Sequence, residues 1–222
     1  EDVPFEFVEE VRAVMVRCPQ HTFQLLTKRS ERMLEFARWM ADGDHISTAE
    51  WPRNVWLGVT AENQEQADKL VPILLQVPAA VRFVSVEPML GQIYLSGLNG
   101  GIYRPWLDFT AWPQNKGLLS WVICGGEAGP KARPMHPDWA RSLRDQCQAS
   151  NVPFFFKQWG QWAPYQDNGP LPSNCRYIGA DGAIRIGDAE ATEDVCMGKV
   201  NKKAAGRLLD GREWDEMPEV QP

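Results

Sequence analysis

Residues 54–63 have the sequence NVWLGVTAEN, an apolar run that ends in a carboxylate and an amide. The run is rich in β-branched and aromatic residues and too short for a free-standing helix, so we expect a buried strand over residues 54–60. Four more runs share this composition and are bounded by turn-forming residues. They span residues 23–27, 81–86, 119–124 and 152–156.

Segments of helical period lie between the strand-like runs. In three of them, apolar side chains recur at the intervals that place them on one helix face. The three sets are Val8, Val11 and Met15; Ala67, Leu70, Val71 and Leu74; and Trp139, Leu143 and Cys147. Strands that alternate with helices pair in parallel through right-handed crossovers. The sequence therefore predicts an α/β fold, an incomplete parallel β/α barrel of the TIM type.

The barrel is expected over residues 1–159, with an inserted loop at 91–118 that is rich in glycine, proline and aromatic residues. Residues 160–222 are expected to form a C-terminal extension that packs on the barrel. Within the extension, the turn pair Asp181-Gly182 predicts a hairpin, because both residues tolerate positive φ. A helical stretch is expected over residues 202–209, closed by an Asp-Gly pair.

The composition indicates a globular domain. The chain has 222 residues, of which 44% are hydrophobic and 23% charged, which is ordinary for a folded protein with a sizeable core. No apolar run approaches the roughly 18 residues that a membrane helix needs, and no secretory leader opens the sequence. We therefore expect a cytoplasmic protein with no membrane partner.

The cysteines and histidines show no metal-ligand spacing. The five cysteines are Cys18, Cys124, Cys147, Cys175 and Cys196. They are odd in number and widely spread, so we expect reduced, mostly buried thiols and no metal site within this chain. Of the histidines, His136 precedes Pro137 and is interpreted as a helix-start residue rather than a catalyst.

The net charge of −6 gives no general attraction to nucleic acid. Local basic clusters do exist, and such clusters are more often solvated surface than binding sites. One cluster contains Lys28, Arg29 and Arg32, and the other contains Lys199, Lys202, Lys203, Arg207 and Arg212. Nucleic acid is left open as a partner but is not indicated by the charge, and the sequence leaves the oligomeric state open.

Charged side chains follow the strand-like runs at their carboxyl ends. Because side chains two residues apart in a strand share a face, Glu62, Glu87 and Glu127 are expected to close the inward faces of their strands. The opposite faces of residues 54–60 and 81–86 are wholly apolar and suit contact with covering helices.

Ligands of parallel β/α folds bind at this carboxyl edge. We therefore predict a catalytic set of Lys28, Glu62, Glu87, Glu127 and Lys157. Three carboxylates that converge repel one another and raise at least one pKa unless cations or a positive ligand group offset them. The two lysines supply part of that compensation. The alternative is a ring of salt bridges that ties the loops at the barrel rim.

Residues next to this set in the same motifs are expected to contact a ligand. The glycines after the 119–124 run would let a ligand approach the backbone, and Trp159 would wall a pocket and stack on a flat ligand. The alternatives are a tight turn and core packing. The predicted ligand-binding residues are Thr27, Arg29, Asn63, Ser85, Gly125, Gly126, Arg133, Gln158 and Trp159.

Seven motifs in order along the chain carry a family resemblance. They are residues 23–29 (FQLLTKR), 54–63 (NVWLGVTAEN), 84–88 (VSVEP), 124–130 (CGGEAGP), 133–139 (RPMHPDW), 155–160 (FFKQWG) and 205–211 (AGRLLDG). Together they are similar to the phage gp-thirty-seven/gp-sixty-eight family, a group of unknown function that is common in phages and prophages. The resemblance covers nearly the whole chain.

The resemblance implies a barrel like that of radical S-adenosylmethionine enzymes. Family members carry an N-terminal β-α unit with a cysteine cluster, and residues 1–222 do not contain that unit. A [4Fe–4S] cluster and S-adenosylmethionine are therefore expected only of a full-length form, and this chain alone holds no cofactor. By position, the resemblance assigns the strand-end set to binding S-adenosylmethionine or substrate, and not to binding metal.

Three functions follow as hypotheses. The first is a radical-S-adenosylmethionine-like enzyme domain that acts on a small molecule or a nucleobase. The second is a non-catalytic phage or host interaction module that keeps the barrel as a scaffold. The third is a cofactor-independent enzyme in which the carboxylates act as acid and base.

Without a preceding unit, the strand at residues 23–27 would have an open edge of unpaired backbone groups. We expect lower stability, self-association, or cover by another segment such as the N-terminal helix or the C-terminal extension.

Overall fold

The computed structural model describes residues 3–42, 51–95, 118–165, 174–186 and 194–219. Most of the predicted inserted loop, residues 96–117, lies outside the described residues. Its first residues, 91–95, form no helix or strand, and the side chains of Ile93 and Leu95 are fully buried. The side-chain amide of Gln146 holds this segment by bonding to Ile93 O at 2.9 Å and to Leu95 N at 2.7 Å.

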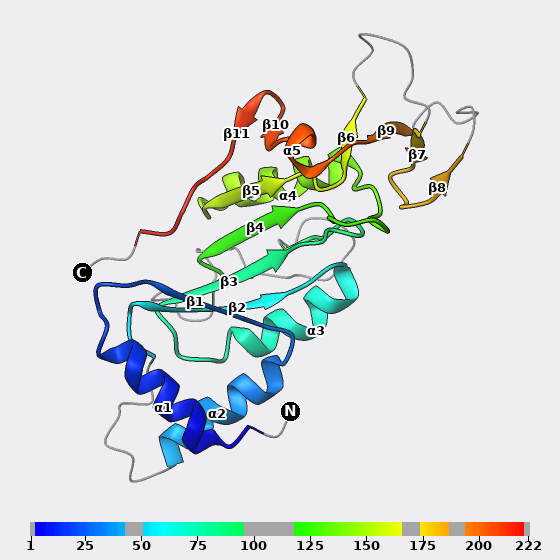
Figure 1. The fold of residues 1–222 in the computed structure, drawn as a ribbon. Coiled ribbons are helices and arrows are strands. Elements are labelled where there is room, and N and C mark those ends of the chain that lie inside the picture. The colour runs from blue at the N-terminus through cyan, green and yellow to red at the C-terminus, as the bar shows by residue number, and fades with distance from the viewer. Residues whose placement is uncertain (1–2, 43–50, 96–117, 166–173, 187–193, 220–222) are drawn as a thin grey trace.

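Five parallel strands form the central sheet, in the order β1-β2-β3-β4-β5 (Figure 1). Their bounds are Phe23–Thr27 (β1), Val55–Thr60 (β2), Val81–Val86 (β3), Trp121–Gly125 (β4) and Phe154–Gln158 (β5). The predicted α/β class with a partial parallel barrel is therefore confirmed. Because neighbouring strands are parallel and sequential, all five carboxyl ends lie along one edge.

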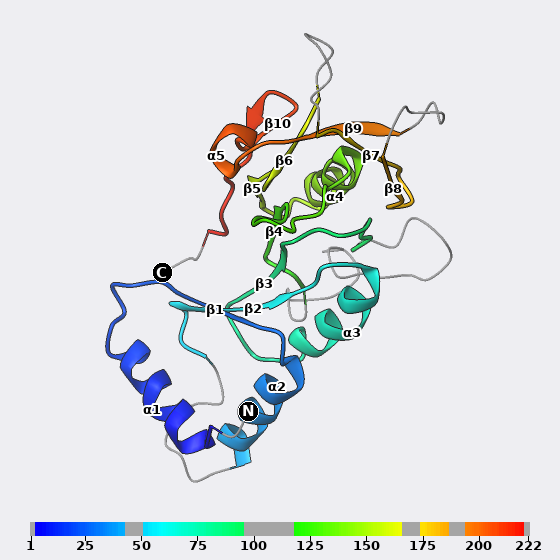
Figure 2. The same cartoon turned by 45° about the vertical axis from the view of Figure 1, so that its right-hand side comes forward.

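Within the described ranges, four helices accompany the sheet, and α2, α3 and α4 lie along one side of it (Figure 2). The helices are α1 (Phe5–Val16), α2 (Ser30–Asp42), α3 (Gln64–Leu74) and α4 (Pro137–Ala149). His136 is the N-cap of α4, since its Nδ1 accepts a hydrogen bond from Asp138 N at 3.1 Å, as the helix-start prediction required. Among the described residues, no helix combines the length and the apolar character needed to span a bilayer.

The buried stripe of α1 differs from the prediction. Met15 is buried and Val8 half-buried, as expected, but Val11 is exposed and Arg12 is buried in its place. The guanidinium of Arg12 is neutralised by Glu9, with N···O distances of 2.7 and 2.8 Å, which lets its long apolar stem pack on the core.

The two faces of the sheet carry different residues, as the alternation of side chains predicted. The helix-covered face joins the main apolar cluster through Val55, Leu57, Val59, Val84 and Val86. The opposite face carries a second, mainly aromatic cluster of Trp56, Val81, Phe83 and Trp121, with Ile123 and Phe155 partly buried against it. Ring centroids in this cluster lie 5.6 to 5.9 Å apart, a range typical of tilted aromatic packing.

The two edges of the sheet are finished differently. Among the described residues β1 pairs only with β2, and Leu26 on this edge strand is half exposed. The other edge is covered by the C-terminal segment, which runs beside β5 (Figure 1). There Phe156 N donates to Trp214 O at 2.7 Å, and Phe155 bridges Asp215 in the antiparallel sense. In the described part of the chain no segment pairs with the outer side of β1, and lower stability or self-association stays a prediction.

A second, antiparallel sheet has the order β6-β9-β7-β8. Its strands are β6 (Trp162–Pro164), β7 (Arg176–Ile178), β8 (Ile184–Arg185) and β9 (Val195–Lys199). The hairpin predicted at Asp181-Gly182 is confirmed, because β7 and β8 pair across it and Gly182 has φ +86°. Asp181 Oδ1 accepts from Ala183 N at 3.0 Å, which fixes the turn.

The helix predicted over residues 202–209 is wrong beyond its first turn. Helix α5 covers only Lys202–Ala205, and β10 (Leu208–Leu209) and β11 (Arg212–Glu213) then form a small hairpin. The Asp210-Gly211 pair has φ values of +54° and +77°, the backbone of a tight hairpin turn. Turn chemistry therefore overrides helical periodicity in this segment.

Side chains of the barrel hold the C-terminal residues in place. Arg141 Nε and Arg144 Nη1 of α4 donate to the two carboxylate oxygens of Asp210 at 2.9 and 2.6 Å. Trp159 Nε1, just after β5, donates to Leu208 O at 2.8 Å. The small hairpin is thus anchored to both α4 and β5.

Cys175 and Cys196 form a disulfide bond, so the prediction of reduced thiols is wrong for this pair. Cys175 directly precedes β7, and Cys196 in β9 lies opposite Tyr177, which places the two Cα atoms 6.2 Å apart. The antiparallel pairing of β7 with β9 brings together two cysteines that lie far apart in the sequence. Cys124 and Cys147 are buried free thiols, as expected.

Gly58 in β2 is a test of the inner-face packing. A Cβ atom at this position would lie 2.4 Å from Phe83 Cζ, and that ring is buried within the aromatic cluster. We predict that Gly58→Ala lowers the free energy of unfolding by about 1–3 kcal/mol because the ring cannot move aside. Urea denaturation followed by tryptophan fluorescence measures the change.

Gly91→Ala is the matched control. Its Cβ would lie 4.0 Å from Asn63 Cβ, an ordinary contact, so its stability should stay within about 0.5 kcal/mol of the wild type. Equal stability of the two variants would contradict the packing of Phe83 over Gly58.

Candidate functional site

The carboxyl edge of the central sheet positions the five predicted strand-end residues. Lys28 directly follows β1, Glu87 directly follows β3, and Lys157 is part of β5. Glu62 and Glu127 each lie two residues beyond the ends of β2 and β4. All five belong to the same edge because their strands are parallel neighbours.

Glu62 links the ends of the first two strands. Its Oε1 accepts from Lys28 Nζ at 2.6 Å. The backbone of Glu62 is held on both sides, since its N–H donates to Gln66 Oε1 at 3.1 Å and its carbonyl accepts from Leu90 N at 2.8 Å. These two hydrogen bonds fix the backbone that carries the Glu62 carboxylate.

Glu87 links the third strand to the fifth. Lys157 Nζ donates to its Oε2 at 2.8 Å, and Gln158 Nε2 donates to its Oε1 at 2.9 Å. Between these strands, the side chain crosses over Gly125 of β4, where a Cβ would lie 3.1 Å from Glu87 Oε1. Only glycine leaves room for this crossing without displacing the carboxylate.

The side chain of Glu127 binds Arg133, which lies in the same loop after β4. Its two oxygens accept from Nε and Nη2 of Arg133, both at 2.9 Å, and Oε2 also accepts from Arg133 N at 2.8 Å. The hydrogen bonds from the Arg133 guanidinium hold the pKa of Glu127 below its ordinary value, and the same bonds raise the pKa of Arg133. The charge of Glu62 adds a smaller contribution to that rise in pKa, which places Glu62 within electrostatic reach of Arg133.

The strand-end charges are layered. The side chains of Glu62 and Glu87 are each 18% exposed, whereas their partners Lys28 and Lys157 are 66% and 51% exposed. Glu127 and Arg133 follow the same order, at 24% and 53%. The carboxylates therefore form the inner layer and the more exposed cationic side chains the outer one.

Several predicted ligand-binding residues have structural duties. Thr27 Oγ1 accepts from Arg29 N at 2.9 Å at the end of β1. Asn63 is the N-cap of α3, with Oδ1 accepting from Gln66 N at 3.0 Å. Ser85 is buried in β3 beside Thr60. These contacts give each of the three residues a structural role that does not require a ligand.

Gly126 and Trp159 also serve the packing of the protein. A Cβ on Gly126 would lie 2.0 Å from Trp159 O, so this glycine admits a neighbouring backbone where a ligand contact had been expected. The Trp159 ring is 5% exposed and packs on Phe156 with centroids 4.9 Å apart. It is therefore mainly a core residue, although it also lines a cavity with Pro137 and Arg141; its stacking on a ligand stays a prediction.

Three predicted side chains remain. Arg29 is exposed just after β1 and lines a pocket with Leu25 and Thr27. The other two keep capacity for a ligand. Arg133 is half exposed beside the carboxylates. Gln158 is 6% exposed, and its Oε1 is buried with no hydrogen-bond partner in the described part of the chain.

The described residues contain no group of three or more His, Cys, Asp or Glu side chains that could hold a metal ion. Burial raises the pKa of the Cys124 thiol, and the charge of Glu87 adds to the rise. Burial likewise raises the pKa of Cys147. Both sulfurs are therefore held in the neutral form, which is a poor nucleophile and a poor metal ligand.

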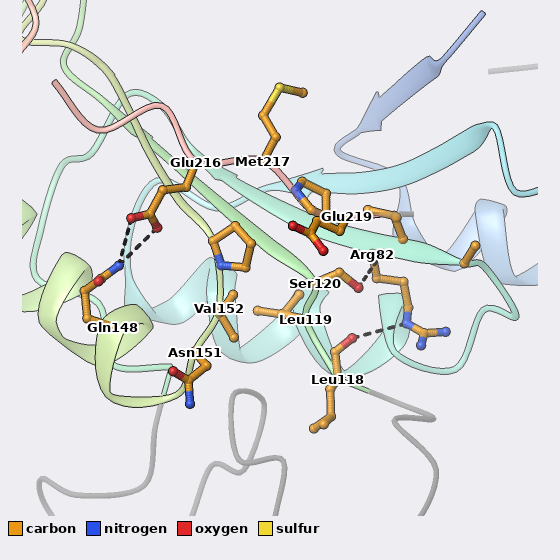
Figure 3. A pocket seen from close by; sticks show the side chains of 14 residues that line it. Arg82, Leu118, Leu119, Ser120, Gln148, Asn151, Val152, Glu216, Met217 and Glu219 are labelled. Carbon is orange, nitrogen blue, oxygen red and sulfur yellow. Dashed lines mark hydrogen bonds between the residues drawn. The ribbon is translucent and has the colours of Figure 1, made fainter. Parts of the chain in front are cut away.

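A cavity of about 630 Å³ lies at the opposite, amino edge of the strands, away from the charged set (Figure 3). Several of its polar side chains are engaged in holding the fold. Arg82 donates to Leu118 O at 3.4 Å and to Val77 O at 3.0 Å, and Gln148 donates to Glu216 at 3.0 Å. The amino edge of such sheets serves stability, and we place the candidate site at the carboxyl edge despite the larger cavity here.

The chain is thus an α/β protein with a partial parallel β/α barrel, and charged side chains lie at the carboxyl ends of its strands. A family model described as "Protein of unknown function (DUF5131)" matches residues 1–218, so the chain belongs to the DUF5131 family. Neither the curated proteins nor the solved structures yield a match to the chain.

The Glu127–Arg133 contact generates a titration test. In Arg133→Gln, the pKa of Glu127 should rise toward its ordinary value of 4.5, because the guanidinium hydrogen bonds that lower it are lost. Carbon-13 NMR of the carboxylate measures this. Because the native pKa of Glu127 lies below its unfolded value, the ionised carboxylate stabilises the fold at pH values above the unfolded pKa. This stabilisation is lost as the pH falls through the native pKa.

Lys131→Gln removes the same charge from an exposed position in the same loop and should leave the pKa of Glu127 unchanged. If the two variants shift the Glu127 titration equally, general charge and not the paired contact is responsible.

Proposed function

We propose that the carboxyl edge of the sheet is the ligand-binding face of an enzyme. Its ligand would be a small molecule with both an ammonium and a carboxylate group. The observation that carries the proposal is the layering of charge, with anchored carboxylates beneath exposed cations. An ion pair at a protein surface is worth at most about 1 kcal/mol, so a ligand can displace its cation at small cost.

Glu62 and Glu87 are the groups best suited to receive a ligand cation. Each is held by one exposed lysine, at 2.6 and 2.8 Å, and that lysine can swing away on its flexible stem. Glu127 is less available because three hydrogen bonds from Arg133 occupy it. We assign Glu127 to positioning Arg133, whose exposed guanidinium would receive the ligand carboxylate.

S-adenosylmethionine meets this description through its amino-acid end and its sulfonium charge. It is also the ligand implied by the resemblance to the phage gp-thirty-seven/gp-sixty-eight family and to radical-S-adenosylmethionine barrels. When bound, S-adenosylmethionine supplies an activated carbon–sulfur bond. In this proposal the chain's own residues bind and orient it, with Glu62 or Glu87 on the ammonium group and Arg133 on the carboxylate. The second substrate would be a small molecule or a nucleobase.

A [4Fe–4S] cluster does not fit the described residues. A cluster needs several thiolates close together. Cys124 and Cys147 are buried as thiols, while Cys175 and Cys196 are bonded to each other. We therefore derive no step that depends on a cluster held by these residues.

Calorimetric titration with S-adenosylmethionine tests the proposal. The wild-type chain should bind it at a single site. Glu62→Gln and Glu87→Gln each keep the shape of the side chain but remove its charge. The variant whose carboxylate receives the ammonium group should bind at least about tenfold more weakly, because one charge-assisted hydrogen bond is lost. Glu65→Gln removes the same charge from an exposed position in the first turn of α3 and should bind like the wild type.

One observation favours a second function, that of a phage or host interaction module. Phe7, Val11 and Val14 are exposed on α1 at the spacing of one helix face, and Leu26 is exposed on the edge strand. The same titration separates the two functions. If S-adenosylmethionine does not bind, or if Glu62→Gln and Glu87→Gln both bind it as tightly as the wild type, the binding face is not the carboxyl edge and the interaction module becomes the leading function.

A further inference from the structure

A basic cleft of about 470 Å³ lies between the end of β5 and the segment that contains α5. It borders the strand-end set through Lys157 but opens onto residues that the proposed function does not use. Its lining residues are Lys157, Gln158, Lys202, Lys203, Gly206 and Arg207. Trp159 N fixes the segment to β5 by donating to Gly206 O at 3.2 Å.

Two cations of this cleft, Lys202 and Lys203, differ from the other basic residues of the C-terminal cluster. Lys199 donates to Pro130 O at 2.7 Å, and Arg212 stacks on Trp214 at 4.0 Å, so both have structural partners. Lys202 and Lys203 are exposed, and neither forms an ion pair with any residue of the described ranges. Two adjacent lysines thus face the cleft with their charge uncompensated.

Arg207 is held in place but not saturated. Its guanidinium lies 5.3 Å over the Phe155 ring, which orients it. The nearest carboxylates, Glu213 and Asp215, are each 3.7 Å away, longer than a hydrogen bond. Its Nε and Nη2 atoms are buried and lack a hydrogen-bond partner among the described residues. The guanidinium therefore retains donors for an oxyanion.

Gln158 supplies the second kind of polar group. The side chain is 94% buried, being 6% exposed, and lines the cleft. Its Nε2 is committed to Glu87, while Oε1 has no partner in the described part of the chain. Buried polar atoms almost always find a partner, so an unpaired acceptor in a cleft marks the place of a donor from outside the protein.

We propose that this cleft binds the phosphate group of a nucleotide, with a hydroxyl or amino group of the same ligand donating to Gln158 Oε1. Lys202, Lys203 and Arg207 provide the cations and planar donors that phosphate recognition uses. The cleft volume falls in the range of small-ligand sites. The net charge of −6 and the nearby Glu87, Glu213 and Asp215 disfavour a long nucleic-acid backbone, which needs a wide basic surface.

Lys157 couples this cleft to the strand-end set. Its Nζ is 2.8 Å from Glu87, and the same side chain lines the cleft. A phosphate in the cleft competes with Glu87 for this ammonium group. Removing the charge of Glu87 therefore strengthens phosphate binding, the opposite of its effect on a ligand whose ammonium group binds Glu87.

Calorimetry of the full chain with AMP, and with adenosine as the phosphate-free control, tests the proposal. AMP should bind and adenosine should bind at least about tenfold more weakly. The double substitution Lys202→Gln/Lys203→Gln should weaken AMP binding at least about tenfold. Lys69→Gln/Lys131→Gln, which removes the same charge from exposed positions elsewhere, should leave the AMP affinity unchanged.

Glu87→Gln should bind AMP several-fold more tightly, a result that also separates this cleft from the proposed function. A short oligothymidylate provides the polymer arm. Binding of the oligonucleotide that is lost in the Lys202→Gln/Lys203→Gln variant would support phosphate recognition but assign it to a nucleic-acid strand. The absence of binding to both probes, or equal binding by the double variant and its control, would overturn the proposal.

Discussion

Parallel, sequential pairing of β1 to β5 is the constraint on which the rest of the structure depends. The backbone hydrogen bonds of this sheet fix the register of neighbouring strands. The pairing of Thr60 with Ser85, for example, sets the position of the end of β2 relative to the end of β3. Because all five strands run the same way, the polar residues that terminate them share an edge. Residues as distant in sequence as Glu87 and Lys157 then meet at 2.8 Å.

The strand-end charges are compatible with the fold because each carboxylate has a cation beside it. Burying three carboxylates without such partners would be unfavourable, and pairing them with exposed lysine or arginine side chains keeps the charges close to solvent. In each pair the acidic group is the less exposed partner and the basic group the more exposed one. The proposed binding face rests on this asymmetry.

Lys157 and Gln158 extend this arrangement to the C-terminal segment. Both contact Glu87 at the carboxyl edge, and both line the basic cleft beside α5. The segment that lines the cleft is held to the end of β5 by Trp159, whose N and Nε1 atoms donate to Gly206 O and Leu208 O. If both proposed sites bind ligands, a charge change at one would reach the other through the Lys157 ammonium group.

Much of the barrel could be predicted from the sequence because its signals are local. The apolar run at residues 54–60 and the alternation along it indicated a strand with a helix-covered face, and Leu57 and Val59 do lie in the main cluster. The placement of the charged residues along one edge of the sheet could be predicted from the parallel topology alone. What failed depended on contacts between distant segments: the Cys175–Cys196 bond, the burial of Trp159, and the space over Gly125 that Glu87 fills. Residues 202–209 failed because a turn pair overrode a helical period.

The central claim is that the strand ends converge on one edge, and paramagnetic relaxation tests it directly. A nitroxide attached at position 28 in a Lys28→Cys, Cys18→Ser background reports on the amides around it. The label should broaden the amides of residues 62, 89 and 127 strongly, and those of residues 82, 121 and 154 at the amino edge weakly. Equal broadening at both edges, or broadening confined to the amino edge, would contradict the account.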